Sequence, residues 1–144
     1  YFLFLKHIKK LTIIKYMIIK ELNAVKKFHK AFEILVNDIP TAVIRKELIE
    51  LRFKLMEEEN QEYLEAARNN DLIEIADALG DMLYILCGTI ITHGMQNKIQ
   101  EVFEEIQKSN MSKLDKNGKP IYREDGKVLK GPNYFKPNIS KALI

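Results

Sequence analysis

Hydrophobic residues recur at helical spacing along most of the chain. From residue 21 to residue 37 they fall three or four positions apart, which predicts a helix that the segment Asp38-Ile39-Pro40 ends. The same spacing predicts a second helix from about residue 41 or 45 to 68, a third from 72 to about 93 and a fourth over roughly 97–108. We therefore expect an all-α fold, an antiparallel helical bundle of four main helices.

Local signals mark the ends of these helices and a different kind of tail. Asp71, followed by Glu74, is typical of a capping box at a helix start, and Gly94 is expected to end the third helix. Turn dipeptides at 117–118 and 125–126 predict a short hairpin-like pairing of residues 120–123 with 127–130. The expected organisation is an N-terminal extension at 1–19, either non-native or an extra helix, a helical domain at 20–110 and a basic tail at 111–144.

Composition narrows the class of protein. The 144 residues, 47% hydrophobic and 30% charged, indicate one soluble globular domain, and the scarcity of Gly and Pro disfavours an all-β fold. The single cysteine, Cys87, excludes an internal disulfide and a cysteine-based zinc finger, which favours a reducing, cytoplasmic location. No uncharged run reaches the roughly 18–20 residues of a membrane span, so no membrane association is expected.

The net charge of +3 conceals a strong division. Residues 1–30 carry eight lysines and one acid, a net of +7, whereas residues 31–107 carry six basic and sixteen acidic side chains, a net of −10. Residues 108–144 carry nine basic and three acidic side chains, a net of +6. Such a pattern suggests that something cationic is held centrally, that something anionic is held at the ends, or both.

The acidic residues of the second and third helices follow their apolar stripes. The stripe through residues 44, 48, 51 and 55 continues onto Glu58 and Glu62, with Glu59 beside it. If the two helices fold back on each other at residue 69, residues whose numbers add up to about 138 lie opposite one another. Six carboxylates are then predicted to share one partly buried patch: Glu58, Glu59, Glu62, Glu74, Asp77 and Asp81.

Crowded carboxylates are costly unless a cation neutralises them or their pKa values rise. Oxygen ligands without His or Cys select Mg²⁺ or Mn²⁺, or Ca²⁺. Taken alone, the run 57–59 is typical of a solvated helix face, and Glu74 is typical of a capping residue. Asp77 and Asp81, however, lie within an apolar helix, and this position favours a metal site. A di-iron centre is disfavoured because no histidine stands in a Glu-x-x-His pair, and the scattered histidines are expected at the surface or in packing.

The pairs Glu59-x-x-Glu62 and Glu74-x-x-Asp77 resemble the ExxE…ExxD signature of the all-α nucleoside triphosphate pyrophosphohydrolases. That superfamily includes MazG-type enzymes and phosphoribosyl-ATP pyrophosphohydrolase, and the segments 58–62, 74–84, 109–114 and 126–132 are particularly similar to the latter subgroup. The resemblance covers about residues 24–140.

The resemblance implies hydrolysis of a nucleoside triphosphate between its α and β phosphates, giving a monophosphate and pyrophosphate. It implies Mg²⁺, with Mn²⁺ as a substitute, held by Glu59, Glu62, Glu74 and Asp77, with Asp81 assisting a further ion. Glu58 matches a position that orients or deprotonates the attacking water, and members form homodimers or dimers of dimers. Three residues of the basic C-terminal part are candidates for contacting substrate phosphates: Asn110, Lys113 and Lys130.

Two other functions compete with this hypothesis. One is a non-enzymatic helical interaction module whose acids meet a cationic partner, and the other is a nucleic-acid binder that uses the basic ends. We expect a nucleotide substrate and no nucleic acid as partner. The sequence leaves the preferred base and sugar, the number of metal ions and the choice between dimer and tetramer open.

Overall fold

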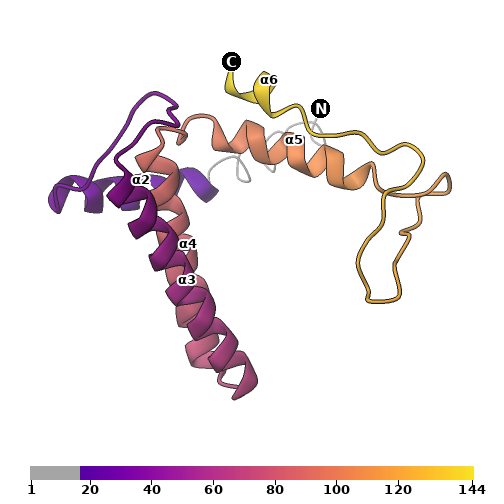
Figure 1. Cartoon of the computed structure of the whole chain (residues 1–144), viewed down its shortest axis with the longest axis horizontal. Helices are drawn as coiled ribbons and strands as arrows, with labels where there is room; N and C mark the ends of the chain where they lie inside the picture. Colours follow the sequence, from indigo (N-terminus) through magenta and orange to yellow (C-terminus); the bar gives the residue numbers. More distant parts are fainter. Residues whose placement is uncertain (1–16) are drawn as a thin grey trace, which may run out of the picture. The chain divides into compact units, whose positions relative to one another are not determined.

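The computed structural model describes residues 17–144, and this part of the chain is helical (Figure 1). No strand forms within it apart from one antiparallel bridge between Tyr122 and Val128, so the all-α prediction is confirmed. Residues 1–16 of the predicted extension lie outside the described residues, while residues 17–19 begin the first helix. The four predicted main helices are all present, followed by a short fifth: α2 Met17–Ala31, α3 Lys46–Arg68, α4 Leu72–Thr92, α5 Ile99–Met111 and α6 Ile139–Leu143.

Helices α3 and α4 form an antiparallel hairpin and lie side by side along its length (Figure 1). Asn70 turns the chain with a positive φ of 56°, which Asn tolerates better than most residues. Asp71 then caps α4, because its carboxylate accepts hydrogen bonds from the backbone N–H groups of Ile73 and Glu74 at 3.0 and 3.2 Å. The short turn sets the level at which side chains of the two helices face each other.

Helix α2 and the loop that follows it contact the end of α4. Glu33 adopts a left-handed φ of 56°, which ends the helix, so the prediction that it continues to residue 37 is wrong. The loop instead bonds to α4, because Asn37 donates from its backbone N–H to the carbonyl of Ile91 and from Nδ2 to that of Thr92. These long-range bonds replace the ones that further helical turns would have made.

Gly94 ends α4 as predicted, and its conformation matters. Its φ is +68°, and a Cβ at this position would lie 2.1 Å from the carbonyl oxygen of Ile39. The backbone of the 32–45 loop therefore approaches α4 at a point that only glycine permits. The Nδ1 atom of His93 lies 2.8 Å from the carbonyl oxygen of Thr41, which fixes the same loop.

Helix α4 is less buried than its composition predicts. Its C-terminal half is enclosed, and Cys87 and Ile91 are fully buried, but Ile73, Leu79 and Leu83 are 79, 49 and 45% exposed. Helices α3 and α2 therefore leave one apolar side of α4 open in the single chain. By length and composition α4 is the one helix within residues 17–144 that could cross a membrane, a weak indication because core helices pass the same test.

The chain divides into two compact units that meet between Gln96 and Asn97. In the second unit α5 packs against α6, and the hydroxyl of Ser109 donates to the carbonyl of Phe135 at 2.8 Å. The predicted hairpin-like pairing is present at the Tyr122–Val128 bridge, beside the hydrogen bond from Leu129 N–H to the Ile121 carbonyl. The boundary predicted at 110 stays a prediction.

Candidate active site

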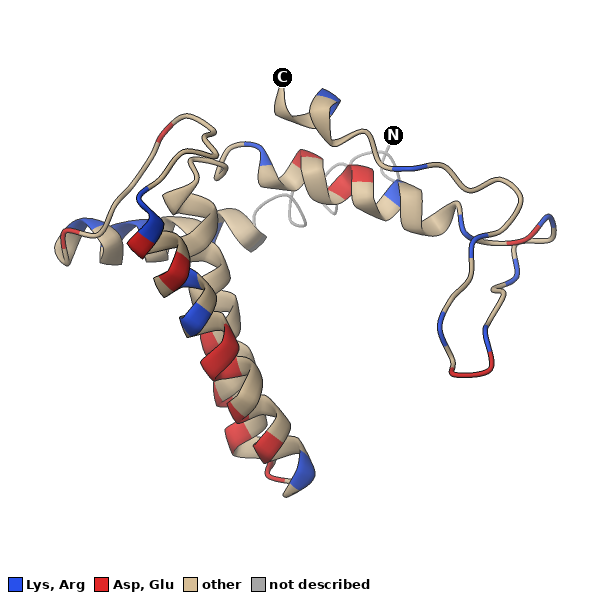
Figure 2. Ribbon diagram, in the orientation of Figure 1, with Lys and Arg blue, Asp and Glu red and all other residues tan. Residues whose placement is uncertain are grey.

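Acidic side chains gather on the half of the α3–α4 hairpin nearest the turn (Figure 2). On α3, Glu58, Glu59 and Glu62 lie within about one turn, and on α4 Asp77 and Asp81 are four residues apart and share a face. The antiparallel packing brings the two sets near each other. We call these five residues the acidic seam.

Glu59 is the centre of the acidic seam. Its side chain is half-buried, and its Oε2 atom is buried with no hydrogen-bond partner within the described part of the chain. Burial raises the pKa of Glu59, and the negative charges of Glu62, Asp81, Glu58 and Asp77 raise it further. The structure therefore brings the other four carboxylates close enough to act on Glu59.

Glu74 lies one turn nearer the start of α4 and is exposed. It is not among the groups that raise the pKa of Glu59. In the predicted capping box the Glu74 carboxylate would accept a hydrogen bond from the backbone N–H of Asp71. That N–H instead donates to the carbonyl of Ala66. The Glu74 carboxylate is thus left free for another role.

The acidic seam is more open than predicted. Glu58, Glu62, Asp77 and Asp81 are exposed in the single chain, and Glu59 alone is half-buried. Within residues 17–144 no three Asp, Glu, His or Cys side chains converge tightly enough to enclose a metal ion.

The donor set still fits a hard divalent cation. All its members are carboxylates, the ligands that Mg²⁺ and Mn²⁺ take together with water and substrate oxygens. A buried carboxylate oxygen without a partner, as at Glu59, costs free energy unless a proton or cation satisfies it. Within the acidic seam, Glu59 is accordingly the residue that a bound cation would stabilise most directly.

The three candidate phosphate contacts lie together within the second unit. Lys113 Nζ donates to Asn110 Oδ1 at 2.7 Å, just after α5. Gly131 donates its N–H to the carbonyl of Lys113 at 2.8 Å, which brings the neighbouring Lys130 to the same region. Lys130 Nζ lies 4.5 Å from the centre of the Tyr134 ring, so its ammonium is held by a cation–π contact.

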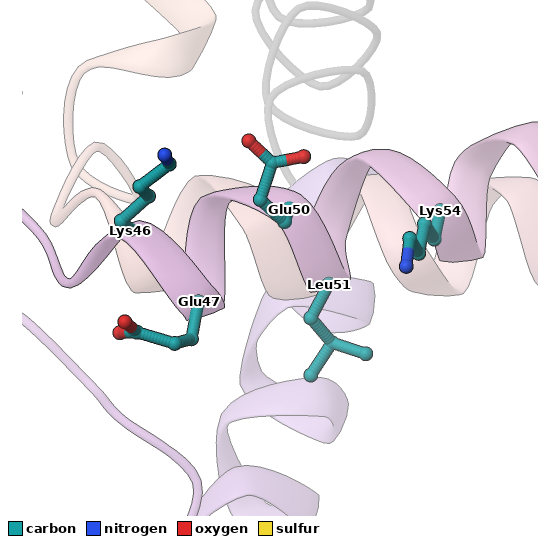
Figure 3. Close-up of a pocket in the computed structure, with 5 residues that line it drawn as sticks. All are labelled: Lys46, Glu47, Glu50, Leu51 and Lys54. Atoms are coloured by element: carbon teal, nitrogen blue, oxygen red, sulfur yellow. The ribbon is translucent and has the colours of Figure 1, made fainter.

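A surface depression of about 490 Å³ lies over the first half of α3. Its lining comes from this one helix, and Figure 3 shows that the side chains point in different directions rather than toward a common centre. An arrangement of this kind does not select a ligand. The lining residues are Lys46, Glu47, Glu50, Leu51 and Lys54.

The sequence predicts that the histidines lie at the surface or in packing, but one of them also contacts a charged side chain. His29 is only 2% exposed, and its Nε2 atom lies 3.1 Å from Nη2 of Arg52. Neither residue belongs to a motif, but Arg52 precedes Glu59 by seven residues, two helical turns on the same face. That spacing was the one signal that could have drawn attention to it.

Comparisons with known proteins found a similar curated sequence and a similar solved structure. An uncharacterised protein of Acanthamoeba polyphaga mimivirus is 35% identical to the chain over 69 residues, which are 48% of the chain. The chain spans only 28% of the length of that curated relative. Among solved structures, that of a proposed NTP pyrophosphohydrolase from Exiguobacterium sp. 255-15 is similar, with 24% identity and a TM-score of 0.47, over 85% of this chain and 93% of the other.

The family assignment comes from a match over most of the described helices. Residues 25–110 match the family described as phosphoribosyl-ATP pyrophosphohydrolase, and this range includes the whole acidic seam. The match covers more than half of the chain. The chain therefore belongs to the phosphoribosyl-ATP pyrophosphohydrolase family.

Proposed function

We propose that the chain is a Mg²⁺-dependent nucleoside triphosphate pyrophosphohydrolase, which cleaves a ribo- or deoxyribonucleotide between its α and β phosphates. The observation that carries this proposal is the acidic seam, where four carboxylates act on Glu59, whose buried Oε2 atom has no hydrogen-bond partner among residues 17–144. A triphosphate and an acidic seam repel each other, so divalent cations must lie between them. Family membership supports nucleotide chemistry at this place.

The residues of the acidic seam and Glu74 would have different roles. Glu59, Glu62, Glu74 and Asp77 would hold the metal, and Asp81 would assist a further ion. When bound, Mg²⁺ lowers the pKa of a coordinated water and neutralises charge that develops on the phosphates. Glu58 is exposed beside Glu59 and would orient the attacking water and accept its proton.

Three basic or polar residues of the second unit are the proposed contacts for substrate phosphates. The Asn110–Lys113 hydrogen bond leaves an amide and an ammonium side by side, a pair that suits phosphate oxygens. Lys130 would add a second ammonium from the tail.

We further propose a homodimer or a dimer of dimers. The exposed side of α4 carries large apolar side chains in a run that is unusual for a monomer surface. A second copy that packs on this side would cover them and would also exclude water from the neighbouring acidic seam. The residues concerned include Ile73, Leu79, Leu83, Tyr84 and Leu86.

Pyrophosphate release is the experiment that tests the function. The wild-type chain should release pyrophosphate from at least one common nucleoside triphosphate with Mg²⁺, and EDTA should abolish the release. Glu59→Gln and Asp77→Asn should lose the activity while staying folded, whereas Glu57→Gln, an exposed neighbour outside the seam, should keep it.

The two competing functions predict different results. A non-enzymatic interaction module would release no pyrophosphate, and Mg²⁺ would not raise its unfolding temperature. A nucleic-acid binder would show steeply salt-dependent binding that survives both seam substitutions.

A further inference from the structure

The α3–α4 interface contains a half-buried arginine whose charge has no carboxylate partner among the residues that the structure describes. The Nη2 atom of Arg52 lies 3.1 Å from Nε2 of His29, and its Nε atom is buried without any hydrogen-bond partner within the described residues. No carboxylate in residues 17–144 forms an ion pair with Arg52. Burial lowers the pKa of the guanidinium, and no acidic group raises it.

His29 holds the guanidinium but does not neutralise it. Its Nδ1 atom lies 3.1 Å from the carbonyl oxygen of Leu35, which can only accept, so Nδ1 carries the proton. Nε2 is then the acceptor for Arg52, and the imidazole is neutral. The pair therefore keeps one full positive charge between the helices.

Gly88 makes the space in which this pair lies. A Cβ at position 88 would lie 2.9 Å from both Arg52 Nη1 and His29 Nε2. Any larger residue on this turn of α4 would displace one of the two side chains. The interface is thus shaped around the guanidinium.

The register connects Arg52 with the acidic seam. Arg52 precedes Glu59 by seven residues on α3, and Gly88 follows Asp81 by seven residues on α4. Arg52 and Gly88 therefore lie two helical turns from the acidic seam, on the same faces of their helices as Glu59 and Asp81. Two turns correspond to about 10 Å along the helix axis. An extended triphosphate with its metal ions can bridge that separation.

A buried cation requires a counter-charge, and residues 1–16 cannot supply one because they contain no Asp or Glu. We propose that Arg52, held by His29, binds the terminal phosphates of the substrate, the part that leaves as pyrophosphate. This inference rests on the proposed function and adds to it an anion site on the α3–α4 hairpin itself. The guanidinium suits this task because its planar array of N–H groups matches phosphate oxygens.

The test measures pyrophosphate binding without turnover. Isothermal titration of the full chain with pyrophosphate, in saturating Mg²⁺, should show at least about tenfold weaker binding for Arg52→Gln than for wild type. The matched control is Arg68→Gln, which removes the same charge from an exposed position at the end of α3 and should change the affinity less than twofold. Gly88→Ala keeps the charge but displaces the pair and should also weaken binding.

Several results would overturn the inference. One is an Arg52→Gln affinity within twofold of wild type, and another is an equal loss in Arg68→Gln, which would indicate general electrostatics. A shift from dimer to monomer with unchanged pyrophosphate affinity would assign Arg52 to a partner chain instead. If circular dichroism shows that Arg52→Gln does not fold, the folded Gly88→Ala variant replaces it, and an affinity within twofold of wild type contradicts the proposal.

The inference and the proposed function fail separately. Absence of pyrophosphate release from every nucleotide by the wild-type chain would count against the enzyme. Binding of pyrophosphate and its dependence on Arg52 are measured in either case.

Discussion

Replacing Glu59 by glutamine should stabilise the metal-free protein and remove its response to Mg²⁺. The substitution keeps the shape of the side chain and removes its charge from beside Glu62 and Asp81. A buried oxygen without a partner costs about 1–3 kcal/mol, and glutamine still places a polar atom there, so we expect a gain near the lower end, about 1 kcal/mol. For a chain of this size that corresponds to a rise of roughly 3 °C in the unfolding temperature.

The pH dependence of this gain has a definite sign. Because the pKa of Glu59 is raised in the folded state, the folded chain binds the proton more tightly than the unfolded chain. The stability that Glu59 contributes is therefore fully present below its unfolded pKa and is lost as the pH rises through the raised folded pKa. The advantage of Glu59→Gln should accordingly appear at neutral pH and vanish in acid.

Thermal unfolding with and without Mg²⁺ measures both effects. Wild type should gain stability on addition of Mg²⁺ and overtake Glu59→Gln, which should not respond. Glu57→Gln, an exposed control on the same helix, should behave as wild type. A Glu59→Gln variant that is less stable than wild type without metal, or that keeps the full response to Mg²⁺, would refute the reasoning.

Three further predictions concern the rest of the molecule. Burial and the nearby Arg52 charge lower the pKa of His29 in the folded chain. The stability that His29 contributes should therefore be complete above about pH 6.5 and be lost as the pH falls through the lowered folded pKa. Urea unfolding at several pH values should show this loss in wild type but not in His29→Gln. Gly94→Ala should lower the free energy of unfolding by at least about 2 kcal/mol, because Gly94 has a positive φ and lies close to the Ile39 carbonyl. Gly80→Ala, at an open position within α4, should raise the free energy of unfolding by up to about 1 kcal/mol. Urea unfolding measures both changes. Leu83→Glu should convert the proposed oligomer to monomer in sedimentation velocity, and an unchanged sedimentation coefficient would place the interface elsewhere.

Features encoded by neighbouring residues were predictable from the sequence. The apolar spacing of α3, the cap at Asp71 and the stop at Gly94 set the limits of the α3–α4 hairpin, and these limits fix the register of the carboxylates. Because a short turn leaves little freedom in that register, the approach of Glu59 to Asp77 and Asp81 followed from counting residues.

Features that depend on contacts between distant residues were not predictable. The helix α2 ends at Ala31 because the loop beyond it bonds to the end of α4, and no local signal near residue 31 announces those bonds. The His29–Arg52 pair likewise joins residues 23 positions apart. Periodicity likewise shows which side chains of α4 are apolar, but not which of them a single chain covers.

The most direct test of the acidic seam is a crystal structure with Mn²⁺ and a nucleotide whose α–β bridge cannot be hydrolysed. The anomalous signal should place at least one Mn²⁺ between α3 and α4, bound to the carboxylates of Glu59 and Asp77 and to phosphate oxygens of the nucleotide. Saturating Mn²⁺ that binds elsewhere, with both carboxylates left facing solvent, would contradict the account.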